Sequence, residues 1–305
     1  MNMILFLLLG FFWSLSFLGI KITIVSLSPL FAATLRVLIA QIVFTTLFLS
    51  MRQNLRVPFC ALWRLWINGI FLQGIPFAAL FFGETYLAPS LACIINSTVG
   101  LWTLVLSILL FKDYSQATVT KITGVIIALL GVITLCWPDL THQHSKLIGI
   151  VAVTIMAISY ALGALLNQRF NQCAHRTSLR ASLWHQHWGS LVFLCILTTI
   201  FMQWPHTLAP LHNTQVIIAL LYLGIFSTAA AWFIYVHLIH TWGSVRASSV
   251  LFLMPVLAII WDRLFLHLVP ATTEYLGVVI VLIGMAFIQF SKRKIGRKYQ
   301  NVRLH

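Results

Sequence analysis

The chain has 305 residues, of which 60% are hydrophobic and only 8% charged, and its mean hydropathy is +0.97. Soluble domains contain roughly 45–50% apolar and about 25% charged residues, so this composition excludes a water-soluble globular protein. The net charge of +14 raises a nucleic-acid partner as an alternative. The basic residues, however, fall in short gaps between apolar runs, so we expect a lipid bilayer and no nucleic acid.

The chain begins with an apolar run, MNMILFLLLGFFW, which has no preceding basic region and no small-residue cleavage site. We therefore expect a retained first helix rather than a removed signal peptide. A membrane-spanning helix needs about 20 mostly apolar residues. Ten such runs are predicted in chain order, at residues 3–23, 29–50, 64–86, 90–111, 119–137, 147–169, 180–203, 214–240, 244–267 and 274–291.

The distribution of Lys and Arg between the runs predicts the orientation. With the N-terminus in the cytoplasm, fifteen basic residues fall in cytoplasmic segments, and only Lys21, Lys146 and Arg263 lie toward the other side. Basic loops stay cytoplasmic, so we expect both termini inside and a multi-pass protein of the inner (plasma) membrane. Residues 292–305 form a basic cytoplasmic tail, interpreted as a topological anchor, with binding of anionic lipid as the alternative.

The two halves of the chain repeat one another. GVIIALLGVI at 124–133 and GVVIVLIGMA at 277–286 both carry glycines seven residues apart, a spacing that places them on one helix face and lets a neighbouring helix approach closely. A shift of 155 residues also superposes Gly100 on Pro255. We therefore predict two five-helix units, 1–137 and 147–291. An odd number of crossings would invert one unit relative to the other, with substrate bound between them.

Four local patterns resemble the EamA family of the drug/metabolite transporter superfamily. They are WSLSFLGIK at 13–21, Arg36 within AATLRVLIA, NSTVGLWTLVLSILLFKD at 96–113, and LFLMPVLAIIWDRLFL at 251–266. The resemblance covers essentially the whole chain. It implies an all-α integral membrane fold of ten helices, transport of a metabolite, and a pathway between the two repeats.

Ionisable groups at membrane depth are costly, so three of them are the first candidates for a gate or charge pair. Arg36 is expected to pair with Glu84 or Asp262 and to open when a substrate charge or a proton replaces one partner. The alternatives are a permanent ion pair and a group that reaches the interface.

Aromatic residues suggest the substrate pathway, because equivalent positions in inverted halves should face one cavity. Under the same shift Phe77 and Leu80 correspond to Trp232 and Tyr235, each set at helical spacing. The predicted pathway residues are Trp13, Phe77, Leu80, Asn96, Trp102, Tyr160, Trp232 and Tyr235. The alternative is ordinary packing or an interfacial belt.

Three residues are predicted hinges, because each weakens the helix backbone in mid-span: Pro76, Gly100 and Pro255. The alternative is a simple kink without ligand contact. His185 and His187 in WHQHW point apart on a helix and lack a carboxylate or Cys beside them, so we expect no metal. No nucleotide-binding motif occurs, and we expect neither a cofactor nor ATP hydrolysis.

The sequence therefore predicts a secondary transporter of a small molecule that works by alternating access, and not an enzyme. An exporter or exchanger of amino acids or related metabolites, S-adenosylmethionine among them, suits an aromatic cavity with few charges. The rival interpretations are a membrane-embedded lipid-modifying enzyme and an assembly or sensor protein without transport. The sequence leaves open whether the protein forms a homodimer.

Overall fold

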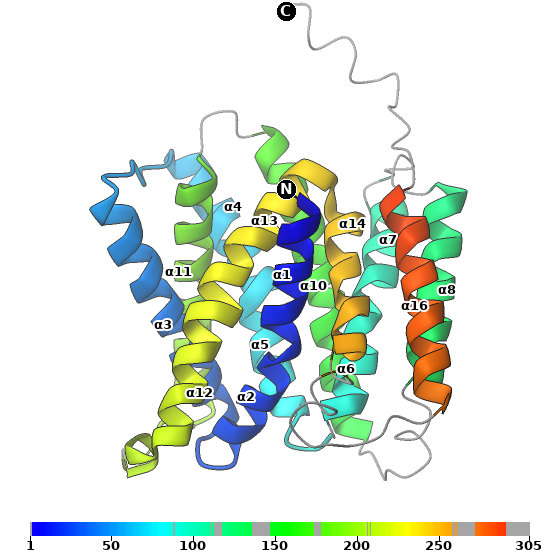
Figure 1. Cartoon of the computed structure of the whole chain (residues 1–305). Coiled ribbons are helices and arrows are strands. Elements are labelled where there is room, and N and C mark those ends of the chain that lie inside the picture. The colour runs from blue at the N-terminus through cyan, green and yellow to red at the C-terminus, as the bar shows by residue number, and fades with distance from the viewer. Residues whose placement is uncertain are drawn as a thin grey trace, which may run out of the picture.

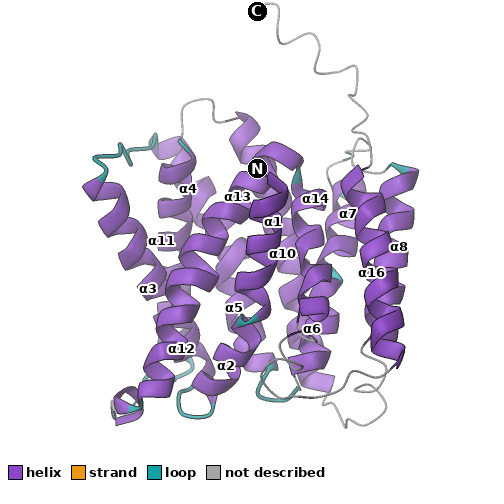
Figure 2. Cartoon of the chain, viewed as in Figure 1, coloured by secondary structure: helices purple, strands orange, loops and turns teal. Residues whose placement is uncertain are grey.

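A computed structural model describes the chain as a bundle of helices, and no strand occurs among the residues that it describes (Figures 1 and 2). Those residues are 2–87, 89–110, 112, 118–135, 147–173, 178–205, 207, 209–257, 260 and 272–290.

The first half of the chain contains helices in each of its five predicted ranges. They are α1 (Asn2–Ser14), α2 (Ser16–Ile24), α3 (Pro29–Ser50), α4 (Phe59–Gly69), the π-helix η1 (Ile70–Gly74), α5 (Ile75–Gly83), α6 (Pro89–Ser97), α7 (Val99–Leu109) and α8 (Val119–Leu135).

The second half follows the same order. Its elements are α10 (Leu147–Cys173), α11 (Leu179–Ile200), the short 3-10 helix η2 (Ala209–His212), α12 (Thr214–Gly224), the π-helix η3 (Ile225–Ala230), α13 (Ala231–Trp242), α14 (Ser244–Ser248), the 3-10 helix η4 (Ser249–Phe252), a helical turn at 253–257 and α16 (Thr272–Phe290).

Five of these helical stretches are long and apolar enough to cross a membrane: Asn2–Ile24, Pro29–Ser50, Phe59–Gly83, Leu147–Phe170 and Thr214–Trp242. The N-terminal end of α1 and the C-terminal end of α16 lie at the same end of the bundle (Figure 1).

Helix boundaries follow local chemistry. Pro29 occupies the first turn of α3, where its missing N–H is not needed. The side chain of Asn213 caps α12 by accepting a hydrogen bond from the Gln215 backbone N at 2.9 Å. Gly243 ends α13 with φ of 88°, a left-handed conformation that a side chain would disfavour.

Two of the predicted spans contain a π-helix. The column from α4 to α5 contains η1, and the column from α12 to α13 contains η3. The two π-helices begin at Ile70 and Ile225, positions related by the 155-residue shift that relates the two halves in sequence. Single π turns are inserted into α-helices most often at functional sites.

The halves interleave rather than stand apart. From the first half, α1 packs on α13, α2 and α3 pack on α12, and α5 packs on α10. The breaks in the two fourth columns also meet: Ser97 Oγ donates to the Leu251 carbonyl at 3.2 Å, and the Phe252 ring lies against Gly100. The core of the bundle therefore lies where the halves meet.

The most intimate helix pair is α8 with α16, the last helix of each half. A Cβ added to Gly124 would lie 2.8 Å from the Gly284 carbonyl oxygen, and one added to Gly131 would lie 2.6 Å from the Val281 nitrogen. The glycines that the sequence placed on one face therefore allow backbone-to-backbone contact.

We predict that Gly284→Leu lowers the thermal midpoint of the purified protein in detergent. Its first side-chain carbon would lie 2.4 Å from the Ala128 nitrogen, and forcing volume into a packed site costs about 1–3 kcal/mol. Intrinsic fluorescence on heating measures the midpoint. Val279→Leu is the matched control, because it adds volume on an exposed face of the same helix. Equal midpoints for the two variants would show that the glycine contact is not tight.

Candidate functional site

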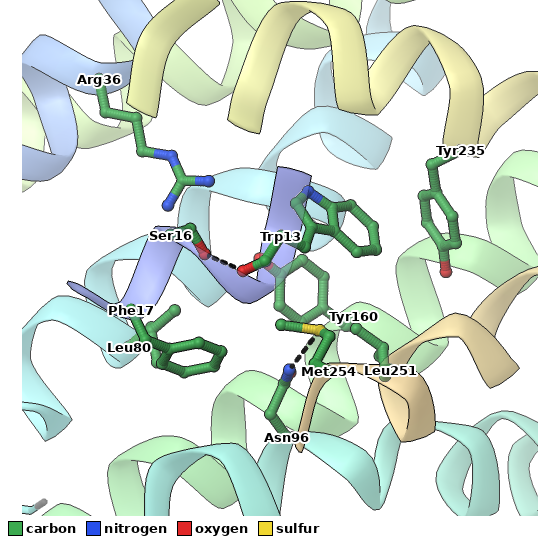
Figure 3. Close-up of a pocket in the computed structure, with 10 residues that line it drawn as sticks. All are labelled: Trp13, Ser16, Phe17, Arg36, Leu80, Asn96, Tyr160, Tyr235, Leu251 and Met254. Atoms are coloured by element: carbon green, nitrogen blue, oxygen red, sulfur yellow. Dashed lines mark hydrogen bonds between the residues drawn. The ribbon is translucent and has the colours of Figure 1, made fainter. Parts of the chain in front are cut away.

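A small cavity lies at the meeting of the two halves, in the middle of the bundle (Figure 3). Its volume is about 30 Å³ as seen by a water-sized sphere, whereas one water occupies about 10–15 Å³ on that measure. The lining comes from both halves and consists of Trp13, Ser16, Phe17, Arg36, Leu80, Asn96, Tyr160, Tyr235, Leu251 and Met254.

Arg36 is the charged residue among those that line this cavity. It belongs to α3, and its side chain is buried in the interior of the bundle, with 2% of its surface exposed. Its Nε donates to Thr228 Oγ1 at 2.7 Å, and its Nη2 donates to Ser227 Oγ at 2.9 Å and to the Ser227 carbonyl at 3.3 Å. The guanidinium carbon lies 4.1 Å from the centre of the Phe77 ring, a cation–π contact. One edge and one face of the guanidinium are thus held by protein.

The acceptors for Arg36 are supplied by η3, the π-helix of the second half. Thr228 Oγ1 accepts from Arg36 and donates to the Leu223 carbonyl at 2.7 Å, so the hydroxyl is fixed from both sides. The Ser227 carbonyl also accepts from Trp13 Nε1 at 3.0 Å. π turns within α-helices are frequent at functional sites, and this one holds the buried cation of the cavity.

An aromatic cluster surrounds the cavity. The Trp13 ring lies 5.0 Å from Tyr235 and 5.6 Å from Trp232, and Tyr160 stacks on Trp232 at 6.0 Å. Tyr235 OH shares a 2.8 Å hydrogen bond with Ser248 Oγ. Aromatic pairs at these separations stabilise their own arrangement, so the cavity wall is preorganised.

The predicted pathway residues divide into three groups. Trp13, Leu80, Asn96, Tyr160 and Tyr235 line the cavity. Phe77 and Trp232 are buried behind it, against Arg36 and Tyr160 respectively. Trp102 packs against the core and is not among the lining residues.

The predicted charge pair between Arg36 and Glu84 is not formed in this conformation. Glu84 is fully buried at the C-terminal end of α5, and neither of its carboxylate oxygens has a hydrogen-bond partner among the described residues. Hydroxyls and a carbonyl of η3 take the place of the carboxylate at Arg36. Asp262 lies outside the described residues, and a gating role for either acid stays a prediction.

The predicted hinges lie at interruptions of the helical columns. Pro76 is in the first turn of α5, directly after η1. Gly100 follows the break between α6 and α7, and Pro255 follows η4. Met254, next to Pro255, accepts a weak hydrogen bond through its sulfur from Asn96 Nδ2 at 3.6 Å. The breaks therefore bring lining residues of the two halves together.

A second group of buried polar side chains escaped the sequence analysis, which looked for charges and aromatic rings. This polar seam lies where α11 packs on α4 and η1, toward the end of the bundle at which α1 begins, and a hydrogen bond from Gln186 to Asn167 links it to α10 (Figure 1). It consists of Asn68, Gln73, Asn167, Ser182, Gln186, His187 and Ser190. The recurrence of small polar residues at 182, 186 and 190 was the signal that could have indicated it.

The polar seam is only partly satisfied by hydrogen bonds. Gln186 Nε2 donates to Asn167 Oδ1 at 3.1 Å, but both amide atoms of Asn68 and the hydroxyls of Ser182 and Ser190 have no partner within the described part of the chain. Each unpaired buried polar atom costs about 1–3 kcal/mol. Such a group needs water or a rearrangement that supplies partners.

A larger groove, of about 380 Å³, lies between α3, α5, α10 and α11. Its lining is apolar except for Gln203, whose Oε1 already accepts from the Leu30 nitrogen at 3.0 Å. The groove therefore has little with which to bind a polar ligand. We place the candidate site at the Arg36 cavity. Among the described residues no group of three His, Cys, Asp or Glu is close enough to hold a metal ion.

Comparison with known proteins identifies the family. An uncharacterized transporter of Archaeoglobus fulgidus is 24% identical, over 91% of this chain and 94% of its own. A probable amino-acid metabolite efflux pump of Escherichia coli strain K12 is also 24% identical, over 92% of each chain. One solved crystal structure shares the fold, with a TM-score of 0.77 at 16% identity, covering 94% of this chain and 95% of that one.

The sequence profile of the EamA-like transporter family matches two segments, residues 1–137 and 147–290, which together make up nearly the whole chain. The all-helical fold, the long apolar helices and the cavity where the halves meet agree with that match. This chain belongs to the EamA-like transporter family and is a multi-pass membrane protein.

Proposed function

We propose that this chain is a secondary transporter of the inner membrane that exports or exchanges a small metabolite, of the amino-acid kind, by alternating access. The observation that carries the proposal is the cavity between the halves, which places a buried cation among aromatic rings. The similarity to a probable amino-acid metabolite efflux pump of Escherichia coli supports the substrate class. We further propose ten spans with both termini cytoplasmic.

The proposal of two inverted repeats, 1–137 and 147–291, with residues 292–305 as a cytoplasmic tail, rests on three features. Helices occur in all ten predicted ranges, and α1 begins on the same side of the bundle on which α16 ends. The two π-helices start 155 residues apart. Both fourth columns are interrupted, at Thr98 and at 249–252.

The size of the cavity bears on the mechanism. Sites for small ligands measure about 300–1,000 Å³, so about 30 Å³ represents a contracted conformation in which no metabolite fits. Transport then requires the helices around the cavity to separate, first toward one side and then toward the other. The interrupted columns, with Pro76, Gly100 and Pro255 beside the breaks, supply places where that movement can occur.

We expect counterflow in proteoliposomes. Vesicles are loaded with amino acids, nucleosides and S-adenosylmethionine, and uptake of each labelled compound is followed; exchange concentrates the label of the transported class only. Ser16→Leu should abolish uptake because it fills the cavity, whereas Ser26→Leu, in an exposed loop, should not. If the folded protein takes up none of these compounds, or Ser16→Leu transports normally, the proposal fails.

The polar seam is expected to open toward the cytoplasm. Several of its unpaired groups, Ser182 and Ser190 among them, lie in the first half of α11, and hydration in an open state would relieve their cost. In a variant whose five native cysteines are replaced by alanine, Ser190→Cys should react with a membrane-impermeant thiol reagent added on the cytoplasmic side.

The control is Leu194→Cys, one turn further along α11 and equally buried among apolar side chains. It should remain unreactive. Reaction of the two cysteines at the same rate, or of neither during active exchange, would contradict opening at the seam.

A further inference from the structure

We propose that Arg36 binds the carboxylate of the transported substrate, so that the substrate is a small organic monocarboxylate with an apolar or aromatic remainder. This inference rests on the proposed transport function and adds the chemical group by which the cavity selects its substrate.

Arg36 has N–H donors that the protein does not use. A guanidinium carries five N–H groups. The Nε and Nη2 groups are directed to Ser227 and Thr228, but Nη1 donates to none of the described residues. Figure 3 shows the end of the side chain directed toward Ser16 and Trp13, into the cavity. One edge is therefore anchored, and Nη1 is available to a ligand.

Among the described residues no carboxylate is in direct contact with Arg36: the buried Glu84 interacts with it electrostatically, but neither Glu84 oxygen has a hydrogen-bond partner. A buried charge without a contacting counter-ion is unfavourable unless a partner is supplied. Neutral hydroxyls and the Phe77 ring are its contacts in the closed cavity. A substrate carboxylate would supply a direct ionic partner, and its plane matches the edge of a guanidinium.

The cavity lining carries a single charge, which limits the charge of the ligand. Arg36 is the only charged residue among those that line the cavity. A phosphate monoester, which carries close to two negative charges, would lack a second cation. One carboxylate balances the site. The rest of the lining is mainly aromatic and aliphatic, with Asn96 and Ser16 as the small polar groups, so the remainder of the ligand is mostly apolar.

The cavity lining offers no counter-ion to an amine. The lining residues include no acid, so the ammonium of an amino acid finds no counter-ion in the cavity; it meets the Asn96 amide and the faces of Trp13 and Tyr160. Recognition therefore depends on the carboxylate. An oxo acid should bind about as well as its amino acid, and the amine without the carboxylate should bind far more weakly.

The test uses matched compounds on the full-length protein in detergent, with the thermal midpoint as a binding readout that does not depend on transport. One set is phenylalanine, phenylpyruvate and phenethylamine; the other is leucine, 4-methyl-2-oxopentanoate and isoamylamine. We expect the acids to raise the midpoint and the amines to require at least tenfold higher concentration for the same shift. Equal potency of acids and amines, or no shift with any acid, overturns the inference.

Variants locate the effect at Arg36. Arg36→Gln should lose the preference for acids, and Arg36→Lys should keep part of it, because a point charge replaces a planar fork. Lys21→Gln, which removes an exposed cation from the neighbouring α2, should behave like the unaltered protein. A full acid preference in Arg36→Gln would overturn the assignment; if that variant does not fold, the comparison of acids with amines in the unaltered protein decides.

The same compounds separate this inference from the transport proposal. Acids that stabilise the protein while counterflow is absent for every class would support the carboxylate site and contradict transport. Counterflow of compounds without a carboxylate, with no advantage for acids, would support transport and overturn the carboxylate site.

Discussion

The burial of one guanidinium is the constraint on which the middle of this bundle depends. At membrane depth no bulk water solvates Arg36, so the protein must supply its partners. It does so across the boundary between the halves: α3 provides the cation, and η3 provides Ser227 and Thr228. The π turn, the approach of α3 to α12 and the position of Phe77 under the guanidinium all belong to this one arrangement.

Hydropathy was sufficient to place the helices, because a spanning segment has a characteristic length and composition whatever its neighbours are. All ten ranges contain helix, and the glycines of the fifth and tenth ranges meet a neighbouring backbone as their spacing indicated. The π turns were not predictable from hydropathy, since they depend on tertiary contacts. Arg36 and five of the eight predicted pathway residues line the cavity, and four of these six are conspicuous in sequence as a charge or an aromatic ring within an apolar run; their part in transport stays a prediction.

The errors have a common physical origin. Glu84 was assigned to Arg36 because opposite charges in a membrane are expected to pair, yet neutral hydroxyls occupy that position. Trp102 was assigned to the cavity because it lies in the same predicted span as Asn96, but its side chain packs against the core and is not among the lining residues. The polar seam was overlooked because amides and hydroxyls carry no net charge and recur in many helices, so their burial becomes evident only when α11 is seen against α4 and η1.

The contact between α8 and α16 limits how the halves move. Gly124, Gly131 and Gly284 bring the two backbones together with no side chain between them, and such a surface has ridges and grooves only at the scale of single residues. Sliding one helix along the other would drive carbonyls and nitrogens into each other. We therefore expect the helices around Arg36 to change their separation during transport while the contact between α8 and α16 stays closed.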